Sequence, residues 1–319
     1  MDLLQPSEKG YYCEPGGFYV DPEQRVVCAV ISHGHADHGA VGGETVYASH
    51  RTRAVLEARY DTAATGKQFR EPFTVNGVEV TFFPANHVFG SSLVRLRYDE
   101  ETWLYTGDYK AARDGTATAL EVVETDVLVT ETTFALPIYT WDAGETVADR
   151  MAHWCQECIG RGETPVLVAY SLGKAQRVLN ALKGQGLGDI KVHRSVAAMN
   201  EVYESAGVDL GEWSKADFCG STWKDSVVVM PQGALETKKV QRYKEKRVAM
   251  VSGWMQVRGN KRWKGFDQGF VLSDHCDWEA LSDYVDKCGA SRVCTVHGYT
   301  EAYARYLREE KGLDAEAWE

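Results

Sequence analysis

The sequence predicts an α/β fold in two parts, a strand-rich first part and a later part in which strands and helices alternate. The chain has 319 residues, 44% of them hydrophobic and 25% charged, which is a globular composition and enough length for one large domain or two smaller ones. Short apolar runs separated by turn signals dominate the first 130 residues. From about Glu145 onward the pattern becomes strand and helix in turn, which is typical of a parallel sheet with its own helices.

The first part is expected to be built mainly from sheet. A β-branched run without helical period predicts a strand at 25–31, and a helical pattern follows at 50–59. Residues 73–83 alternate around Asn76-Gly77, a strong signal for a tight hairpin turn. Further strands are expected at 91–97, 102–105 and 126–130.

The second part is expected to alternate. The predicted elements are a helix through Cys158, a strand at 166–169, a helix at 173–182, strands at 226–230, 248–251, 269–272 and 292–296, and final helices at 278–287 and 301–310. Polar signatures follow four of the predicted strands, at His33 to His38, Asp108, Glu131 and His297. Strand ends are where catalytic side chains are held by the sheet and exposed by the loops.

Composition also narrows the class of protein. No apolar run of about 20 residues is present, so a membrane-spanning helix is excluded. The N-terminal residues lack a basic segment followed by an apolar one, and the expected location is therefore the cytoplasm.

The charge of the chain is unevenly distributed. The formal net charge is −11, yet residues 238–264 carry ten basic residues and one acidic residue, a local charge of +9. A basic patch on an acidic body attracts a polyanion locally, although a solvated helix face would explain it as well. Tyr243, Trp254 and Trp263 lie among these cations and are candidates for stacking on bases.

The segment His33-Gly-His35-Ala-Asp37-His38 is the strongest single motif. It offers four metal ligands within six residues, directly after an apolar strand. Imidazole nitrogens and carboxylate oxygens suit zinc or manganese. Histidines two residues apart at the end of a strand can reach one ion, while Asp37 and His38 point toward a second. His87, Asp108 and His297 are further candidates, each weak alone, for completing a site of two ions.

These motifs resemble those of a known family. In order, His33-x-His35-x-Asp37-His38, His87 and Asp108 resemble the metal motifs of the metallo-β-lactamase fold, and Asp21 in FYVDP resembles its first motif. Glu131 in TETTF, His275 in LSDHCDW and His297 in TVHGY resemble the extra motifs of the β-CASP nucleases. The resemblance implies an αββα sandwich formed by residues 1–135 and 273–319, with a β-CASP cap domain inserted at 136–272.

Within the cap, Tyr170-Ser171-Leu-Gly173-Lys174 resembles the segment with which crosslink-repair 5′-exonucleases hold a terminal phosphate, and Ser252-Gly-Trp254 resembles another phosphate-lining turn. A strand running through Ser-Leu-Gly-Lys into a helix would present N–H groups, a hydroxyl and an ammonium to an anion, although Ser171 could equally cap the helix. Over nearly its whole length the chain is most similar to bacterial ligase-associated DNA exonucleases. This similarity implies DNA as substrate and an ATP-dependent DNA ligase and a helicase as partners.

The roles implied by the resemblance are those of a two-ion phosphodiesterase. One zinc or manganese ion is expected on His33, His35 and His87, another on Asp37, His38 and His297, with Asp108 bridging and a shared hydroxide as nucleophile that Asp37 also orients. His275, supported by Glu131, is expected to contact the scissile phosphate or protonate the leaving oxygen. The candidate phosphate and DNA contacts are Ser171, Gly173, Lys174, Ser252, Arg258, Lys261 and Arg262.

Other functions remain open at this point. The same metal core would serve an RNA-processing β-CASP enzyme, and the preference for a 5′ end on DNA rests on resemblance alone. A thioesterase or lactonase would need neither the long inserted segment nor the basic residues of 238–264, which we call the basic window. A scaffold without activity would not need the full set of ligand candidates. Cys276, next to His275, is expected to pack behind the site.

Overall fold

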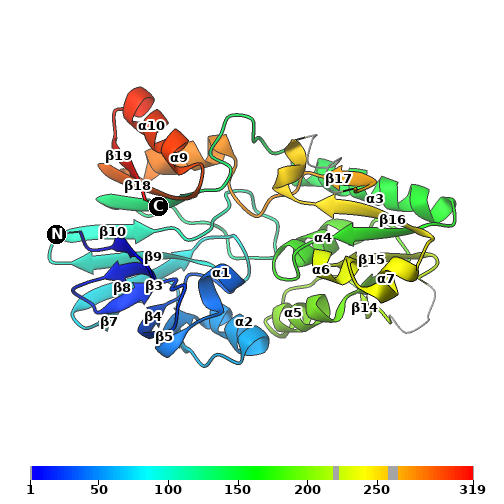
Figure 1. Cartoon of the computed structure of the whole chain (residues 1–319), viewed down its shortest axis with the longest axis horizontal. Coiled ribbons are helices and arrows are strands. Elements are labelled where there is room, and N and C mark those ends of the chain that lie inside the picture. The colour runs from blue at the N-terminus through cyan, green and yellow to red at the C-terminus, as the bar shows by residue number, and fades with distance from the viewer. Residues whose placement is uncertain (1, 218–222, 258–264, 319) are drawn as a thin grey trace. The chain divides into compact units, whose positions relative to one another are not determined.

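The computed structural model describes residues 2–217, 223–257 and 265–318 (Figure 1). The chain forms two compact units. Unit 1 contains the chain up to Arg113, Ala117–Thr140 and the chain from His275 onward, whereas unit 2 contains Asp114–Thr116 and Trp141–Asp274.

The first sheet of unit 1 runs in the order β1-β2-β3-β4-β5-β6, antiparallel from β1 to β3 and parallel from β3 to β6. Its strands are β1 (Gln5–Ser7), β2 (Gly10–Cys13), β3 (Phe18–Val20), β4 (Val26–Val30), β5 (Gly43–Ser49) and β6 (Thr65–Lys67). Two helices accompany it, the short α1 (Ala36–Gly39) and α2 (His50–Tyr60). The Ser49 side chain caps α2 by accepting a hydrogen bond from the Thr52 N–H, so the helix starts where the strand ends.

The second sheet of unit 1 has the order β19-β18-β11-β10-β9-β8-β7 among the described residues. Its strands are β7 (Phe73–Val75), β8 (Val78–Pro84), β9 (Ser92–Tyr98), β10 (Glu101–Tyr105), β11 (Val127–Thr132), β18 (Arg292–Gly298) and β19 (Asp314–Ala317). Strands β7 to β10 form antiparallel hairpins, and β10, β11, β18 and β19 are parallel. The helix α9 (Trp278–Cys288) precedes β18 in the chain, and α10 (Thr300–Lys311) follows it.

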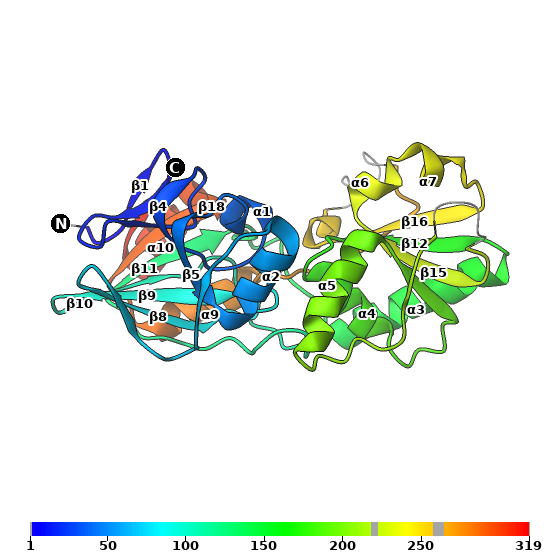
Figure 2. The same ribbon diagram turned by 90° about the horizontal axis from the view of Figure 1, so that it is seen from below.

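The two sheets of unit 1 pack face to face, because their strands alternate between two hydrophobic clusters. In β10, Trp103 and Tyr105 lie in the cluster shared with Phe18 and Val30 of the first sheet, whereas Leu104 lies in the cluster shared with α9 and α10. This is the period of two that a strand buried on both faces requires. A third cluster packs the other face of the first sheet against Leu56 of α2. The resulting order is helices, sheet, sheet, helices (Figures 1 and 2).

Unit 2 is a parallel sheet of order β14-β13-β15-β12-β16-β17 in the part of the chain that is described. Its strands are β12 (Thr164–Val168), β13 (Asp189–Val192), β14 (Ser214–Lys215), β15 (Ser226–Met230), β16 (Lys246–Val251) and β17 (Gln268–Phe270). Helices α3 (Gly144–Gly160), α4 (Lys174–Leu182) and α5 (Arg194–Ser205) cover one face, and α6 (Gln232–Leu235) and α7 (Lys238–Arg242) cover the other (Figure 2). The 3₁₀ helix η1 (Gly253–Gln256) follows β16.

The predicted α/β class and alternation are confirmed, and every predicted helix and strand has a counterpart. Asn76 and Gly77 both have positive φ, 47° and 92°, as the predicted tight hairpin requires. The sequence reading missed short strands such as β13 and β19. It also placed Glu131 and His297 after their strands, whereas both are among the last residues of β11 and β18. Among the described residues, no helix combines the length and apolar character that crossing a bilayer requires.

We expect Leu128→Ala to lower the free energy of unfolding of the protein by about 2–5 kcal/mol, because Leu128 is fully buried in the central strand β11 and its loss leaves a cavity. Val122→Ala is the matched control, since Val122 is 51% exposed and its truncation should change stability by less than about 0.5 kcal/mol. Denaturant unfolding followed by circular dichroism measures both. Equal effects of the two substitutions would contradict the packing described here.

Candidate functional site

The candidate metal ligands of unit 1 come from loops and strand ends of both sheets. His33 and His35 follow β4, and α1 carries Asp37 and His38. His87 follows β8, and Asp108 follows β10. The sheet packing therefore gathers side chains that lie up to 75 residues apart in sequence.

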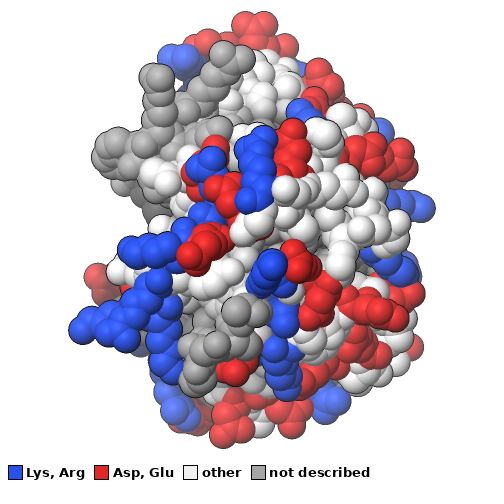
Figure 3. Space-filling model, turned by 90° about the vertical axis from the view of Figure 1, so that its right-hand side faces the viewer, with Lys and Arg blue, Asp and Glu red and all other residues white. Residues whose placement is uncertain are grey.

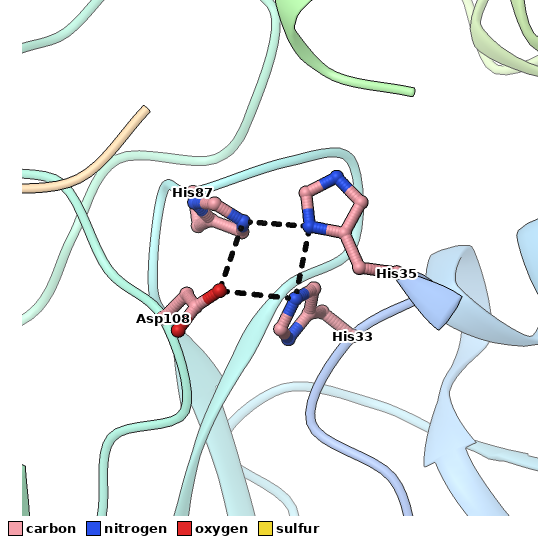
Figure 4. Close-up of side chains that lie close together, drawn as sticks. All are labelled: His33, His35, His87 and Asp108. Atoms are coloured by element: carbon pink, nitrogen blue, oxygen red, sulfur yellow. Dashed lines mark hydrogen bonds and ion pairs between the residues drawn. The ribbon is translucent and has the colours of Figure 1, made fainter. Parts of the chain in front are cut away.

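Four of these side chains converge on one point (Figure 4). His35 Nδ1 lies 3.2 Å from His33 Nε2 and 3.0 Å from His87 Nε2, and Asp108 Oδ2 lies 3.5 Å from Nε2 of both His33 and His87. Ligand atoms about 2.1 Å from one ion lie roughly 3.0–3.4 Å apart, so these spacings suit a single zinc-sized cation. We refer to His33, His35, His87 and Asp108 as the four-ligand cluster.

The hydrogen bonds of His33 show which of its nitrogens faces the cluster as an electron-pair donor. The Ser32 hydroxyl donates to Asp21 Oδ2, because a carboxylate oxygen only accepts. Ser32 Oγ, 2.9 Å from His33 Nδ1, therefore accepts the Nδ1 proton, which leaves the lone pair on Nε2. Burial, with the neighbouring histidines, lowers the pKa of His33 well below its usual value, so the ring is neutral at pH 7.

Asp108 is also strongly affected by its surroundings. Burial and the nearby Glu131 raise the pKa of the Asp108 carboxyl, while His275, His38 and His297 act in the opposite direction. A divalent ion would bind both groups, because a neutral imidazole such as His33 and a carboxylate such as Asp108 are the forms in which these side chains act as metal ligands. The residues present therefore fit a metal ion.

The second expected ligand group is more open. His38 Nε2 lies 3.9 Å from Asp37 Oδ2 and 3.8 Å from Asp108 Oδ2, and the rings of His38 and His297 are 5.5 Å apart between centroids. The Asp37 side chain is 77% exposed, and His297 is exposed as well. His38 thus lies beside Asp108 of the four-ligand cluster, and Asp37 and His297 lie near His38 without converging as tightly.

Asp21 organises the buried side of both groups. Its carboxylate accepts hydrogen bonds from the Ser32 N–H, the Ser32 hydroxyl and His38 Nδ1, at 2.7, 2.5 and 2.7 Å. Burial lowers the pKa of the His38 imidazole, but Asp21, Asp108 and Asp37 outweigh this effect and raise it to about 10. Sequence reading noted Asp21 only through resemblance and missed Ser32, because nothing in a single serine indicates a contact with a residue at another strand end.

Tyr11 is a second residue that sequence reading missed. Its hydroxyl lies 3.5 Å from His297 Nε2, and its ring packs edge-on to that imidazole. Burial and the charges of Asp21, Glu23 and Asp108 raise the pKa of the Tyr11 phenol, so it stays a neutral hydrogen-bonding group.

His275 and Glu131 form a pair next to the four-ligand cluster. His275 Nδ1 lies 2.9 and 2.8 Å from the two carboxylate oxygens of Glu131, and the ring centroids of His275 and His87 are 4.7 Å apart. Burial raises the pKa of Glu131, but His275 and the hydrogen bonds to the carboxylate, including the Tyr109 N–H, outweigh burial and lower it. The ionised Glu131 therefore accepts a hydrogen bond from Nδ1–H and fixes the orientation of the His275 ring.

Cys276, beside His275, is buried in the hydrophobic cluster with Tyr284 and Leu281. Burial raises the pKa of its thiol well above the usual value. The residue packs behind the site, as expected.

The predicted phosphate-binding segments lie in unit 2, at the carboxyl end of its sheet. Ser171 follows β12 and Ser252 follows β16, and these two strands are parallel neighbours. Gly173 has a φ of 85°, and its N–H donates to Gln176 Oε1 at 2.7 Å. Ser252 is buried, and its hydroxyl oxygen accepts from the Trp254 N–H. Lys174 is also buried, and its ammonium lies 3.1 Å from Asp274 Oδ2.

Part of the basic window is visible on unit 2. Lys238, Lys239 and Arg242 of α7 are exposed, and Lys and Arg side chains gather toward the left of the face in Figure 3. Trp254 is 39% exposed, whereas Tyr243 packs on Trp223 with ring centroids 5.0 Å apart and contacts the Thr164 hydroxyl. Tyr243 is therefore a packing residue. Arg258, Lys261, Arg262 and Trp263 lie outside the described residues.

Comparison with known proteins gives relatives along most of the chain, although no family model matches it. A probable DNA ligase of Opitutus terrae is 32% identical over 96% of this chain and 30% of its own length. The DNA cross-link repair protein SNM1 of Arabidopsis thaliana is 24% identical over 80% of this chain and 57% of its own length. An RNase J-like protein of Methanocaldococcus jannaschii is 24% identical over 54% of this chain and 48% of its own length.

The chain thus spans between 30% and 57% of the length of these three relatives. Among solved structures, a protein of unknown function from Enterococcus faecalis V583 has a TM-score of 0.59 and 14% identity, covering 92% of this chain and 79% of its own. That likeness shows a shared fold. The relatives confirm the resemblance carried by the His and Asp motifs, and the chain is homologous to the β-CASP nucleases.

Proposed function

We propose that the protein is a metal-dependent nuclease that removes nucleotides from the 5′-phosphorylated end of a DNA strand during repair. The observation that carries this proposal is the buried four-ligand cluster with the His275–Glu131 pair directly beside it. Ligand atoms of Asp108, Glu131 and His275 lie within 4.8 Å of one another. Asp108, which would bind the cation, and His275, which would move a proton, therefore both have the Glu131 carboxylate as a neighbour.

The proposal includes the fold of the family. Residues 1–135 and 273–319, bounds close to those of unit 1, would form the αββα metallo-β-lactamase sandwich, and residues 136–272, close to unit 2, would form the β-CASP cap. Its support is the layer order of unit 1 and the parallel sheet of unit 2.

The four-ligand cluster would hold one ion and share Asp108 with a second ion on Asp37, His38 and His297. Divalent ions there would supply Lewis-acid activation of water and stabilise the charge that develops on the attacked phosphate. Zinc and manganese both suit this donor set of imidazoles and carboxylates.

The residues of the chain would do the rest. Asp21 and Ser32 keep His33 Nε2 and His38 in place, and Asp37, exposed at the start of α1, would accept the proton of the attacking water. His275 would donate a proton from Nε2 to the leaving 3′-oxygen, because ionised Glu131 favours the protonated ring.

The substrate assignment is part of the proposal. Among the relatives, one is named a probable DNA ligase and another a DNA cross-link repair protein, which supports DNA and a ligase as partner. The relatives give no support for a helicase. Ser171 and Ser252 would receive the terminal phosphate, and the basic window with Arg258, Lys261 and Arg262 would hold the strand behind it. Because an RNase J-like protein is also a relative, RNA processing is the second candidate.

A digest of end-labelled single strands separates these functions. We expect stepwise release of nucleotides from the 5′ end of DNA, faster with a 5′-phosphate than with a 5′-hydroxyl, in zinc or manganese. Internal cuts, or faster turnover of the matching RNA, would move the protein to the RNA-processing function.

Removing one ligand should remove metal. We expect wild-type protein to hold about two ions per chain and His87→Ala to hold about one, with loss of nuclease activity. Elemental analysis after dialysis measures this. His153→Ala is the control, because His153 is 75% exposed in unit 2 and should leave metal content unchanged. Equal metal content in all three proteins would contradict the site.

His275→Gln should reduce kcat by about 10²–10⁴-fold, because a proton donor to the leaving group is lost, while metal content stays at the wild-type level. Single-turnover kinetics and elemental analysis measure the two quantities on the same preparation. A parallel loss of metal and turnover would make His275 a ligand instead of an acid.

A further inference from the structure

Helix α4 of unit 2 carries two buried cations on one face. Lys174 and Arg177 are 4% and 7% exposed, and they lie three residues apart, so their side chains are neighbours on the helix. Buried charges in proteins need partners of opposite charge, and these two side chains share the carboxylate of Asp274 as a partner. Asp274 is 3% exposed and forms ion pairs with both: its Oδ2 lies 3.1 Å from Lys174 Nζ, and its Oδ1 lies 2.8 Å from Arg177 Nη1.

The same two cations also hold the backbone before Asp274. Lys174 Nζ donates to the Leu272 carbonyl at 2.8 Å, and Arg177 Nη1 donates to the Ser273 carbonyl. Three consecutive residues, 272–274, are therefore fixed by one helical turn.

Arg177 also reaches a second chain segment. Its Nε lies 2.5 Å from Asp114 Oδ2, and Asn180, one turn further along α4, donates to the Asp114 carbonyl at 2.7 Å. Asp114–Thr116 is the short stretch that belongs to unit 2 although the chain on both sides of it belongs to unit 1. We refer to Lys174, Arg177, Asp274 and Asp114 as the α4 clamp.

Both held segments continue directly into the candidate active site of unit 1. Asp274 is bonded to His275, the proposed proton donor, and Asp114 follows the proposed bridging ligand Asp108 by six residues. The charges within the clamp, two positive and two negative, balance, so the Lys174 ammonium is already neutralised by a carboxylate. A lysine that held a terminal phosphate would instead direct its charge to the phosphate oxygens.

We propose that Lys174 and Arg177 are positioning residues for catalysis: the α4 clamp fixes the backbone conformation that presents His275. This inference rests on the proposed function for its catalytic readout, and it gives Lys174 a role different from the phosphate contact that the sequence indicated. Small displacements of a proton donor have large effects on turnover, which makes the clamp testable by kinetics.

The test compares Lys174→Met, Asp274→Asn and the conservative Lys174→Arg with Lys183→Met. Lys183 is the matched control, because it caps the other end of α4 and pairs with Asp209 at the surface. Each variant is assayed on one DNA strand prepared with a 5′-phosphate and with a 5′-hydroxyl. We expect Lys174→Met to lower kcat by about 10²-fold on both ends with the KM ratio of the two ends unchanged. Asp274→Asn should change kcat in the same direction, and Lys174→Arg should restore most of it.

A different pattern overturns the inference. If Lys174→Met raises KM only for the phosphorylated end and leaves kcat unchanged, Lys174 is a phosphate ligand. Should Lys174→Met not fold, Asp274→Asn decides alone: unchanged kcat there also overturns the clamp.

Amide hydrogen exchange tests the clamp without any activity. Peptides covering 271–279 should exchange faster in Lys174→Met and Asp274→Asn than in wild type and Lys183→Met, because the groups that hold this backbone are lost. Unchanged exchange in both variants overturns the inference. If wild-type protein degrades no DNA, the proposed function fails, while this exchange measurement still decides the clamp.

Discussion

The candidate site depends on one constraint, the requirement that every polar atom buried between strand ends has a partner. His33, His38 and Asp108 are at most 8% exposed, and Asp21 is 4% exposed, so none of them can rely on water. Asp21 accepts hydrogen bonds from Ser32 and His38, and Ser32 Oγ in turn accepts one from His33 Nδ1. On the inward side of the four-ligand cluster, imidazole nitrogens and the Asp108 carboxylate oxygen face one another at spacings that would suit a cation.

The same constraint explains the His275–Glu131 pair. Glu131 is a buried carboxylate at the end of β11, and it remains ionised because the Tyr109 N–H and the His275 ring bind it. The pair is thus a consequence of burying an acid beside a cluster of bases, and it fixes the orientation of the His275 ring. The α4 clamp in unit 2 repeats the pattern with opposite charges, since Lys174 and Arg177 are tolerated in the interior only because Asp274 and Asp114 neutralise them.

The sequence pattern predicted the order of elements well, because each prediction rested on local chemistry. The Asn76-Gly77 turn, the apolar strand before His33 and the alternation after Glu145 are all readable within about ten residues. Two of the strands that were missed, β13 and β19, are short and have mixed burial, so no local period marks them. Their pairing is decided by neighbouring strands that are distant in sequence.

For the site, the sequence by itself determined which residue types are available, since the spacing of His33, His35, Asp37 and His38 after a strand is a local property. Only the tertiary structure decided how they are used. It turned Ser32 and Tyr11 into partners of candidate ligand histidines, packed Tyr243 against Trp223, and assigned the Lys174 ammonium to Asp274, a residue 100 positions later. The physical reason is that a side chain's role is set by the partners and the dielectric around it, and both come from residues that only folding brings into contact.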